Sequence, residues 1–178
     1  SKKKIILISI TNNIKSFDIE NLGAKFYDLL KDFKSNECQL NSNTVPYNIK
    51  NLVGHFLHGL TLKSYTFDKY KTKKSKKKIT IFVTGENKPS FKKQIKFKAI
   101  EEGSFYTRDL VSEPGNVLHP DEYAKRISAL KKYGLKITVY DEKKLKKLGM
   151  HALLGVGQGS IRGSYLVTME WNGAKKNS

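Results

Sequence analysis

Two histidines with helical spacing, His55 and His58, are the residues of this sequence that first suggest metal chemistry. Residues three apart lie on the same face of a helix, so both imidazoles could reach one zinc ion. A zinc site needs at least a third ligand, and one class of zinc peptidases places a glutamate directly after the first histidine. Phe56 occupies that position. The pattern therefore favours histidines with a structural role over a metal site.

The residues that could serve in nucleophilic catalysis are scattered along the chain. His119 precedes a proline, His151 lies in a glycine-containing stretch, and Cys38 has no evident histidine partner. A cysteine nucleophile needs a base within hydrogen-bond reach, so no Cys-His site is predicted. A single cysteine also excludes an internal disulfide and is typical of a reducing cytoplasm.

Three alternating glycines, Gly155, Gly157 and Gly159, suggest a phosphate-binding loop. A dinucleotide-binding loop has the spacing Gly-x-Gly-x-x-Gly and lies between a strand and a helix. In this sequence the third glycine comes one position early, and a short helix is predicted before the loop. The pattern therefore favours a tight backbone turn packed in the core, where glycine permits positive φ angles.

The acidic residues include two adjacent pairs, Asp121-Glu122 and Asp141-Glu142. Neighbouring side chains on a helix do not face each other, so neither pair converges on one point as metal ligands would. Both pairs stand where helices are predicted to begin, and negative charge is favourable there. We therefore assign no catalytic, cofactor-binding or metal-binding residue in this sequence.

Hydrophobic periodicity predicts helices that alternate with strands. Helices are expected over residues 21–33, 49–62, 89–111, 120–133 and 141–148, and strands over residues 4–11, 79–84, 136–140 and 164–170, with a short edge strand within 35–46. Asp18 could cap the first helix or lie in its first turn, and Gly134 should end the fourth. Pro114 should end the third helix, with Asn116 in a turn or cap beyond it. Such alternation is typical of an α/β protein with largely parallel sheets.

Composition indicates a folded protein without membrane contact. The chain has 178 residues, of which 38% are hydrophobic, enough to form a buried core. The longest apolar run, from Ile5 to Ile10, is too short to span a bilayer, and no signal peptide is recognisable. These features predict a cytoplasmic location.

The formal net charge of +18 raises the question of nucleic-acid binding. Only three of the 34 basic residues are arginine, the side chain that makes bidentate contacts to phosphates and bases. The lysine-rich run 69–78 is predicted to be a solvated loop, because like charges repel and resist burial. Tyr65, Phe67 and Tyr70 could stack on bases, but their alternation favours a strand with inward-facing aromatics. Nucleic acid is thus an alternative partner that the sequence does not favour.

Three groups of residues stand out by their order and spacing. They are Tyr65-x-Phe67-Asp68-x-Tyr70 after a predicted helix; Arg108-Asp109-Leu110-Val111 with Pro114-x-Asn116; and Leu148-Gly149-Met150 with Gly155-Val156-Gly157-Gln158-Gly159-Ser160, followed by residues 166–173. Together they resemble the leucyl aminopeptidase (cytosol aminopeptidase) family. Ser112, Gly115, Trp171 and the stretch 163–165 depart from the residues usual in that family.

The resemblance implies an α/β fold in two parts. Residues 1–102 would form an incomplete, macro-domain-like amino-terminal α/β domain. Residues 103–178 would form the first elements of the αβα catalytic domain, including its first βαβ unit. The implied activity is release of amino-terminal residues from peptides by a cytoplasmic homohexamer that carries two divalent metal ions, zinc or manganese. The metal ligands of the family lie beyond the segment that this sequence matches. We therefore expect no metal in this chain and no activity from it alone.

Overall fold

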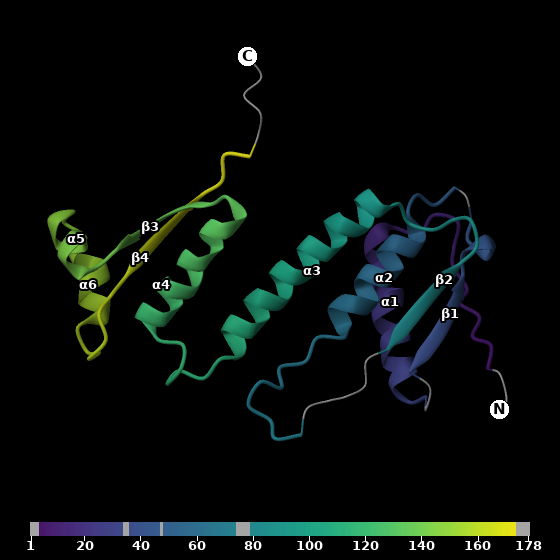
Figure 1. Ribbon diagram of the computed structural model, residues 1–178, viewed down its shortest axis with the longest axis horizontal. Helices are drawn as coiled ribbons and strands as arrows, with labels where there is room; N and C mark the ends of the chain where they lie inside the picture. Colours follow the sequence, from purple (N-terminus) through teal and green to yellow (C-terminus); the bar gives the residue numbers. More distant parts are fainter. Residues whose placement is uncertain (1–3, 34–35, 47, 74–78, 174–178) are drawn as a thin grey trace, which may run out of the picture. The chain divides into compact units, whose positions relative to one another are not determined.

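The chain forms two compact units, Ser1–Val111 and Ser112–Ser178, and the sequence-based division at residue 102 stays a prediction. The computed structural model describes residues 4–33, 36–46, 48–73 and 79–173 (Figure 1). Helices and strands occur in both units, which confirms the predicted α/β class.

Unit 1 combines three helices with a two-stranded parallel sheet. Its elements are α1 (Ser16–Lys31), β1 (Glu37–Asn41), the 3-10 helix η1 (Ser42–Thr44), α2 (Leu52–Lys63), β2 (Thr80–Thr84) and α3 (Phe91–Ser112), the last ending at the unit boundary. The strands pair in register from Glu37 opposite Thr80 to Asn41 opposite Thr84. The predicted edge strand within 35–46 is thus confirmed as β1. Asp18 lies in the first turn of α1, as predicted.

The core of unit 1 lies where α1 and α2 cross. Side chains of α1 at helical spacing meet those of α2, and the partly buried residues of β1 and β2 pack against the same cluster. The buried members are Ile19, Phe26, Tyr27, Leu30, Leu52, Phe56 and Leu60. Ring centroids of Phe26 and Phe56 are 5.4 Å apart. The amphipathic pattern of both helices therefore decides which faces meet.

Two glycines let the backbones of α1 and α2 come into direct contact. A Cβ atom added at Gly23 would lie 1.9 Å from the carbonyl oxygen of Phe56. One added at Gly59 would lie 1.9 Å from the carbonyl oxygen of Glu20. Both obstacles are backbone atoms of the partner helix, so a side-chain movement could not relieve either clash. The crossing therefore requires glycine at both positions.

Helix α3 is joined to the rest of unit 1 mainly through polar and aromatic contacts. Leu110 is its only buried residue. Arg108 donates a hydrogen bond of 2.6 Å to the carbonyl oxygen of Leu62, and Tyr65 donates one of 2.8 Å to Asp109. The rings of Tyr65 and Phe105 also touch. Tyr65 therefore fixes the segment after α2 against α3.

Unit 2 is built around a two-stranded antiparallel sheet. Its elements are α4 (Pro120–Ser128), the 3-10 helix η2 (Ala129–Tyr133), β3 (Lys136–Tyr140), α5 (Glu142–Lys147), α6 (His151–Gly157) and β4 (Leu166–Glu170). Strand β4 starts beside the end of β3, with Leu166 opposite Tyr140. Helices α5 and α6 therefore connect the same ends of the two strands and do not cross over the sheet. The predicted βαβ unit and parallel pairing are wrong for this part of the chain.

The predicted ends of the short elements in unit 2 are confirmed. Pro120 stands at the start of α4, and Gly134 ends η2 with a φ of 89°. The side chain of Asp141 caps α5 by accepting a hydrogen bond from the backbone N–H of Lys144. Gly149 follows α5 with a φ of 71°. Glycine suits both positive-φ positions because it has no Cβ. Asn116 lies in a turn, as predicted.

Two segments predicted as strands have no strand structure. Residues 4–11 are irregular and belong to no sheet in the described chain, with Ile6 and Ile10 against the core and Leu7 91% exposed. Residues 65–68 are irregular, and Tyr65 and Phe67 are half-buried. Alternation alone does not make a strand, since a strand also needs hydrogen bonds to a neighbouring strand, and these two segments have none in the described chain. Lysines 69, 71 and 73 are exposed, as predicted, while residues 74–78 of the same run lie outside the described residues.

Among the residues that the structure describes, no helix has the length and apolar character needed to cross a membrane.

The contact of α1 and α2 at Gly23 predicts that the stability of unit 1 depends on where an alanine is introduced. Gly23→Ala should destabilise unit 1 by about 3 kcal/mol, since overpacking against immobile neighbours costs that order of energy. Gly103→Ala is the matched control, because a Cβ at this helical position has nothing within 4 Å. It should stabilise by about 0.5–1 kcal/mol through helix propensity. Amide hydrogen exchange in α1 and α2 during urea titration measures the stability of unit 1 separately. Equal effects of the two variants would contradict the proposed contact.

Candidate functional site

The two helically spaced histidines bind two different glutamates. His55 Nδ1 lies 2.8 Å from Glu20 Oε1 on α1, and His58 Nδ1 lies 2.7 Å from Glu101 Oε1 on α3. Both imidazoles also pack on the ring of Phe97, with centroids 5.1 and 4.6 Å away. The pair therefore links α2 to its two neighbouring helices, and each histidine has its own acidic partner.

The remaining candidates for catalysis do not assemble into a reactive group. His119 bonds to Asp121, and the Arg162 guanidinium lies 3.5 Å from the same imidazole nitrogen. His151 is exposed at the start of α6. Burial raises the pKa of the Cys38 thiol, which disfavours the reactive thiolate. The described part of the chain contains no group of three or more His, Cys, Asp or Glu residues that could hold a metal ion.

The acidic residues at the start of α4 take part in a charge cluster within unit 2. Arg126 bonds to Glu122 at 3.0 Å, one helical turn away, and to Glu113 at 2.8 Å. The side chain of Glu113 is only 1% exposed, so its charge depends on this partner. The hydrogen bond from Arg126 lowers the pKa of Glu122. At Asp121, desolvation works to raise the pKa, but the hydrogen bond with His119 and the charge of Arg162 make the net shift downward.

The glycine stretch 155–159 is neither a phosphate loop nor a buried tight turn. Gly155 and Gly157 lie within helix α6, and the stretch is mostly exposed. A Cβ at Gly159 would meet nothing within 4 Å, and its φ is not positive. The prediction of a core turn was wrong because the glycine stretch lies at the surface, where the neighbouring apolar side chains of α6 are also largely exposed. Val156, for example, is 89% exposed.

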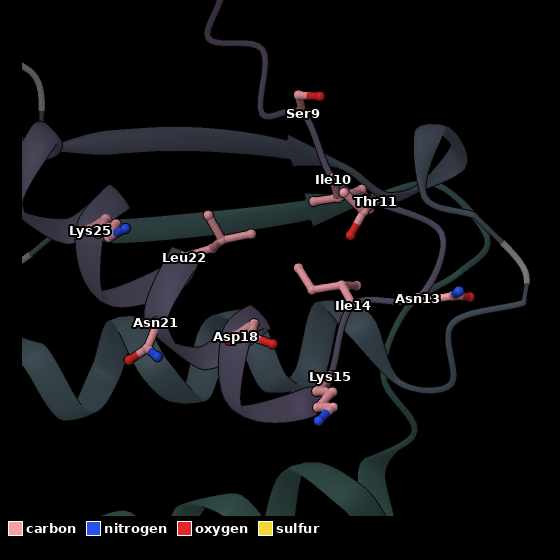
Figure 2. Close-up of a pocket in the computed structure, with 10 residues that line it drawn as sticks. All are labelled: Ser9, Ile10, Thr11, Asn13, Ile14, Lys15, Asp18, Asn21, Leu22 and Lys25. Carbon is pink, nitrogen blue, oxygen red and sulfur yellow. The ribbon is translucent and has the colours of Figure 1, made fainter.

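A cavity of about 410 Å³ lies beside the first turns of α1 (Figure 2). Ile14 and Leu22 lie on its apolar side, and Ile10 comes from the irregular segment before the helix. Lys15, Asp18 and Lys25 add charges of both signs at its border. Ser9 and Thr11 supply hydroxyls, but no histidine or cysteine lines this cavity. The lining therefore offers a hydroxyl without the histidine that could activate it as a nucleophile. The sequence did not predict this cavity, because residues 9–11 were expected to end a strand and residues 12–15 to follow it.

Comparison with known proteins indicates the family of this chain, which the geometry of its side chains does not. Residues 105–178 match the family model described as the cytosol aminopeptidase family, catalytic domain. A Brucella ovis protein named "Probable cytosol aminopeptidase" is 48% identical over 126 residues, which is 66% of this chain and 25% of that protein. The protein of the same name from Phytoplasma mali is 43% identical over 127 residues, or 67% of this chain and 26% of that protein. The chain therefore spans about a quarter of the length of these relatives.

Solved structures show that the fold is shared more widely. The bottromycin maturation enzyme BotP in complex with Mn matches with a TM-score of 0.72 at 21% identity, over 88% of this chain and 33% of that chain. A variant of tomato leucine aminopeptidase matches with a TM-score of 0.75 at 17% identity, over 89% of this chain and 34% of that chain. At these identities the matches concern the fold. The nucleic-acid alternative gains no support from any of these comparisons.

The exposed position of Gly159 predicts tolerance to substitution. Gly159→Val should change the stability of unit 2 by less than about 0.5 kcal/mol, as is usual for open surface positions. Gly134→Val should cost about 1–3 kcal/mol, because a side chain is strained at a φ of 89°. A Cβ there would also lie 3.3 Å from the Trp171 ring, so tryptophan fluorescence during urea unfolding can follow both variants. A large loss for Gly159→Val alone would restore the core-turn prediction.

The Arg126 contact predicts how the stability of unit 2 depends on pH. Because the pKa of Glu122 is lowered from 4.5, the contact stabilises the fold above pH 4.5 and is lost as pH falls through the lower, folded-state pKa. In the double variant Glu113→Gln/Arg126→Met, which leaves no buried carboxylate unpaired, the pKa of Glu122 should return towards 4.5. An NMR titration of the Glu122 carboxyl carbon measures this. Lys125→Met is the control, since Lys125 is 81% exposed and 3.7 Å from Glu122. An equal shift in both variants would contradict a dominant role of the Arg126 hydrogen bond, because Lys125 would then lower the pKa of Glu122 as strongly.

Proposed function

We propose that this chain, which belongs to the cytosol aminopeptidase family, is part of a metal-dependent enzyme that releases amino-terminal residues from peptides. Sequence similarity to this family carries the proposal. A family model of the catalytic domain matches residues 105–178, and the 48% identity to a relative extends over 126 residues. Identity at this level over two thirds of the chain supports more than a shared fold.

The described residues do not form the metal site that the proposal requires. Two-metal hydrolysis needs several carboxylates that converge on two ions. Asp121 and Glu122 start α4 and pair with His119 and Arg126, while Asp141 caps α5. No metal-binding group of three residues occurs in the described ranges. We therefore propose that the ligands of two divalent ions, zinc or manganese, belong to the part of the relatives' length that this chain does not match.

The other expected properties of the whole protein are proposals of the same kind. The family name, cytosol aminopeptidase, favours a cytoplasmic location. The resemblance of this chain to the family implies a homohexamer that acts on peptides. Residues 1–102 would belong to the amino-terminal α/β domain and residues 103–178 to the first elements of the catalytic domain. This boundary would lie inside the long helix α3.

The proposal is tested with two proteins. One is the 178-residue chain, and the longer one is the full-length Brucella relative in which this chain replaces the matched residues. Both are incubated with leucine amide in the presence of Mn²⁺ or Zn²⁺. We expect metal-dependent release of leucine from the longer protein, abolished by a chelator, and none from the 178-residue chain. Metal-dependent release by the short chain would contradict the assignment of the ligands. Absence of release by the longer protein, folded and metal-loaded, would contradict the proposed function.

A further inference from the structure

Asn172 is the only asparagine of the chain that is followed by a glycine. The pair lies just after β4, where residues 171–173 are irregular and exposed (Figure 1). In an Asn-Gly pair the backbone nitrogen of the glycine can attack the side-chain carbonyl of the asparagine, because no Cβ hinders the approach and the glycine backbone turns freely. Sequence and local structure therefore both point to spontaneous chemistry at this pair.

The attacking nitrogen is not held by the sheet. The ladder of β3 and β4 ends where Lys136 pairs with Glu170, before the Asn-Gly pair begins. Within the described ranges, the backbone N–H of Gly173 and the side chain of Asn172 make no hydrogen bond. Neither group has to give up a partner before the nitrogen and the side-chain carbonyl can meet.

A second exposed asparagine of unit 2, Asn116, lacks this access. It lies in the turn before α4 and is followed by Val117. The branched side chain of Val117 crowds its backbone. The backbone nitrogen of Val117 also donates a hydrogen bond of 2.9 Å to the carbonyl oxygen of Pro114. The two asparagines thus share exposure to solvent but differ in access to the nitrogen that follows.

The structure also explains why a glycine follows Asn172. A Cβ atom added at Gly173 would collide with the indole of Trp171. The same ring lies beside Gly134, where an added Cβ would be 3.3 Å from it. Trp171, Gly134 and Gly173 are called the tryptophan corner below. The indole packs on the backbones of both glycines, and the glycine that this packing needs is the residue that makes Asn172 reactive.

We propose that Asn172 is a site of spontaneous deamidation and that one of the products opens the tryptophan corner. The nitrogen of Gly173 loses its proton to solvent and forms a bond to Cγ of Asn172. The bond from Cγ to the amide nitrogen breaks, and ammonia leaves with a proton taken from water. Water then opens the cyclic imide at Cγ, which gives aspartate, or at the backbone carbonyl carbon, which gives isoaspartate. Nothing is oxidised or reduced, and the only co-reactant is water.

The two products affect the corner differently. Aspartate replaces an amide by a carboxylate and leaves the main chain unchanged. Isoaspartate also carries the main chain through the Cβ of residue 172, which lengthens the backbone between Trp171 and Gly173. The contact of the indole with Gly173 depends on that backbone, so isoaspartate should release the ring. Trp171 is the only tryptophan of the chain, and its fluorescence therefore reports this corner. The reaction does not depend on the proposed peptidase activity.

The experiment incubates the folded 178-residue chain at mildly acidic and at mildly alkaline pH. Peptide mapping by mass spectrometry follows the asparagines, and fluorescence follows Trp171. The peptide with Asn172 should show the exchange of an amide for an acid, faster at alkaline pH because the attacking nitrogen must lose a proton. The peptide with Asn116 should stay unchanged over the same time. The fluorescence should change in step with the isoaspartate that fragmentation spectra detect.

Two variants separate the causes. Asn172→Gln cannot form the same ring and should lose both the mass change and the fluorescence change. Asn172→Asp carries the new charge without the longer backbone and should keep the fluorescence of the parent chain. Equal modification of Asn116 and Asn172 would overturn the proposal, because exposure alone would then decide. Modification of Asn172 only when the chain is unfolded in urea would overturn it too, since the fold would then protect the site. An unchanged fluorescence after isoaspartate has formed would overturn the opening of the corner.

Discussion

The contact between the backbones of α1 and α2 is the constraint on which the rest of unit 1 depends. At Gly23 and Gly59 each helix meets carbonyl oxygens of the other, so the two axes come closer than side chains would allow. That approach brings Phe26 and Phe56 into ring contact and forms the apolar cluster against which β1 and β2 pack. It also fixes α2, whose later turns carry the contact of His58 with Glu101 of α3. Losing one glycine contact would therefore disturb several features together.

Unit 2 is organised by a different balance of forces. Among its described residues, few apolar side chains are buried, namely Ala124, Ile127, Ile137 and Leu145. The Glu113–Arg126 pair contributes a buried charge that must stay paired, which ties the segment before α4 to the helix itself. Helix caps and left-handed glycines define the short elements around the sheet. Helix caps and turn glycines therefore explain more of the structure of unit 2 than of unit 1, where packing between elements distant in sequence dominates.

The described residues provide scaffolding, while family membership provides the expected chemistry. Three of the four histidines, His55, His58 and His119, are already engaged by neighbouring carboxylates. This pairing gives these histidines structural contacts in place of a shared reactive site. The match of residues 105–178 and the identity to curated relatives concern the whole pattern of the sequence, so they identify the family without any single catalytic residue.

The sequence by itself determined the local elements, because their signals are local. The spacing of apolar residues predicted α1, α2 and α3, and Pro120, Gly134 and Asp141 marked helix and turn boundaries that the structure confirms. It also carried the family resemblance. Only the tertiary structure decided which strands pair, because residues 4–11 have strand character but no partner, and β4 returns antiparallel beside β3. The close approach of α1 and α2 could not be predicted either, since it depends on Gly23 and Gly59 meeting backbone atoms of a helix that is distant in sequence.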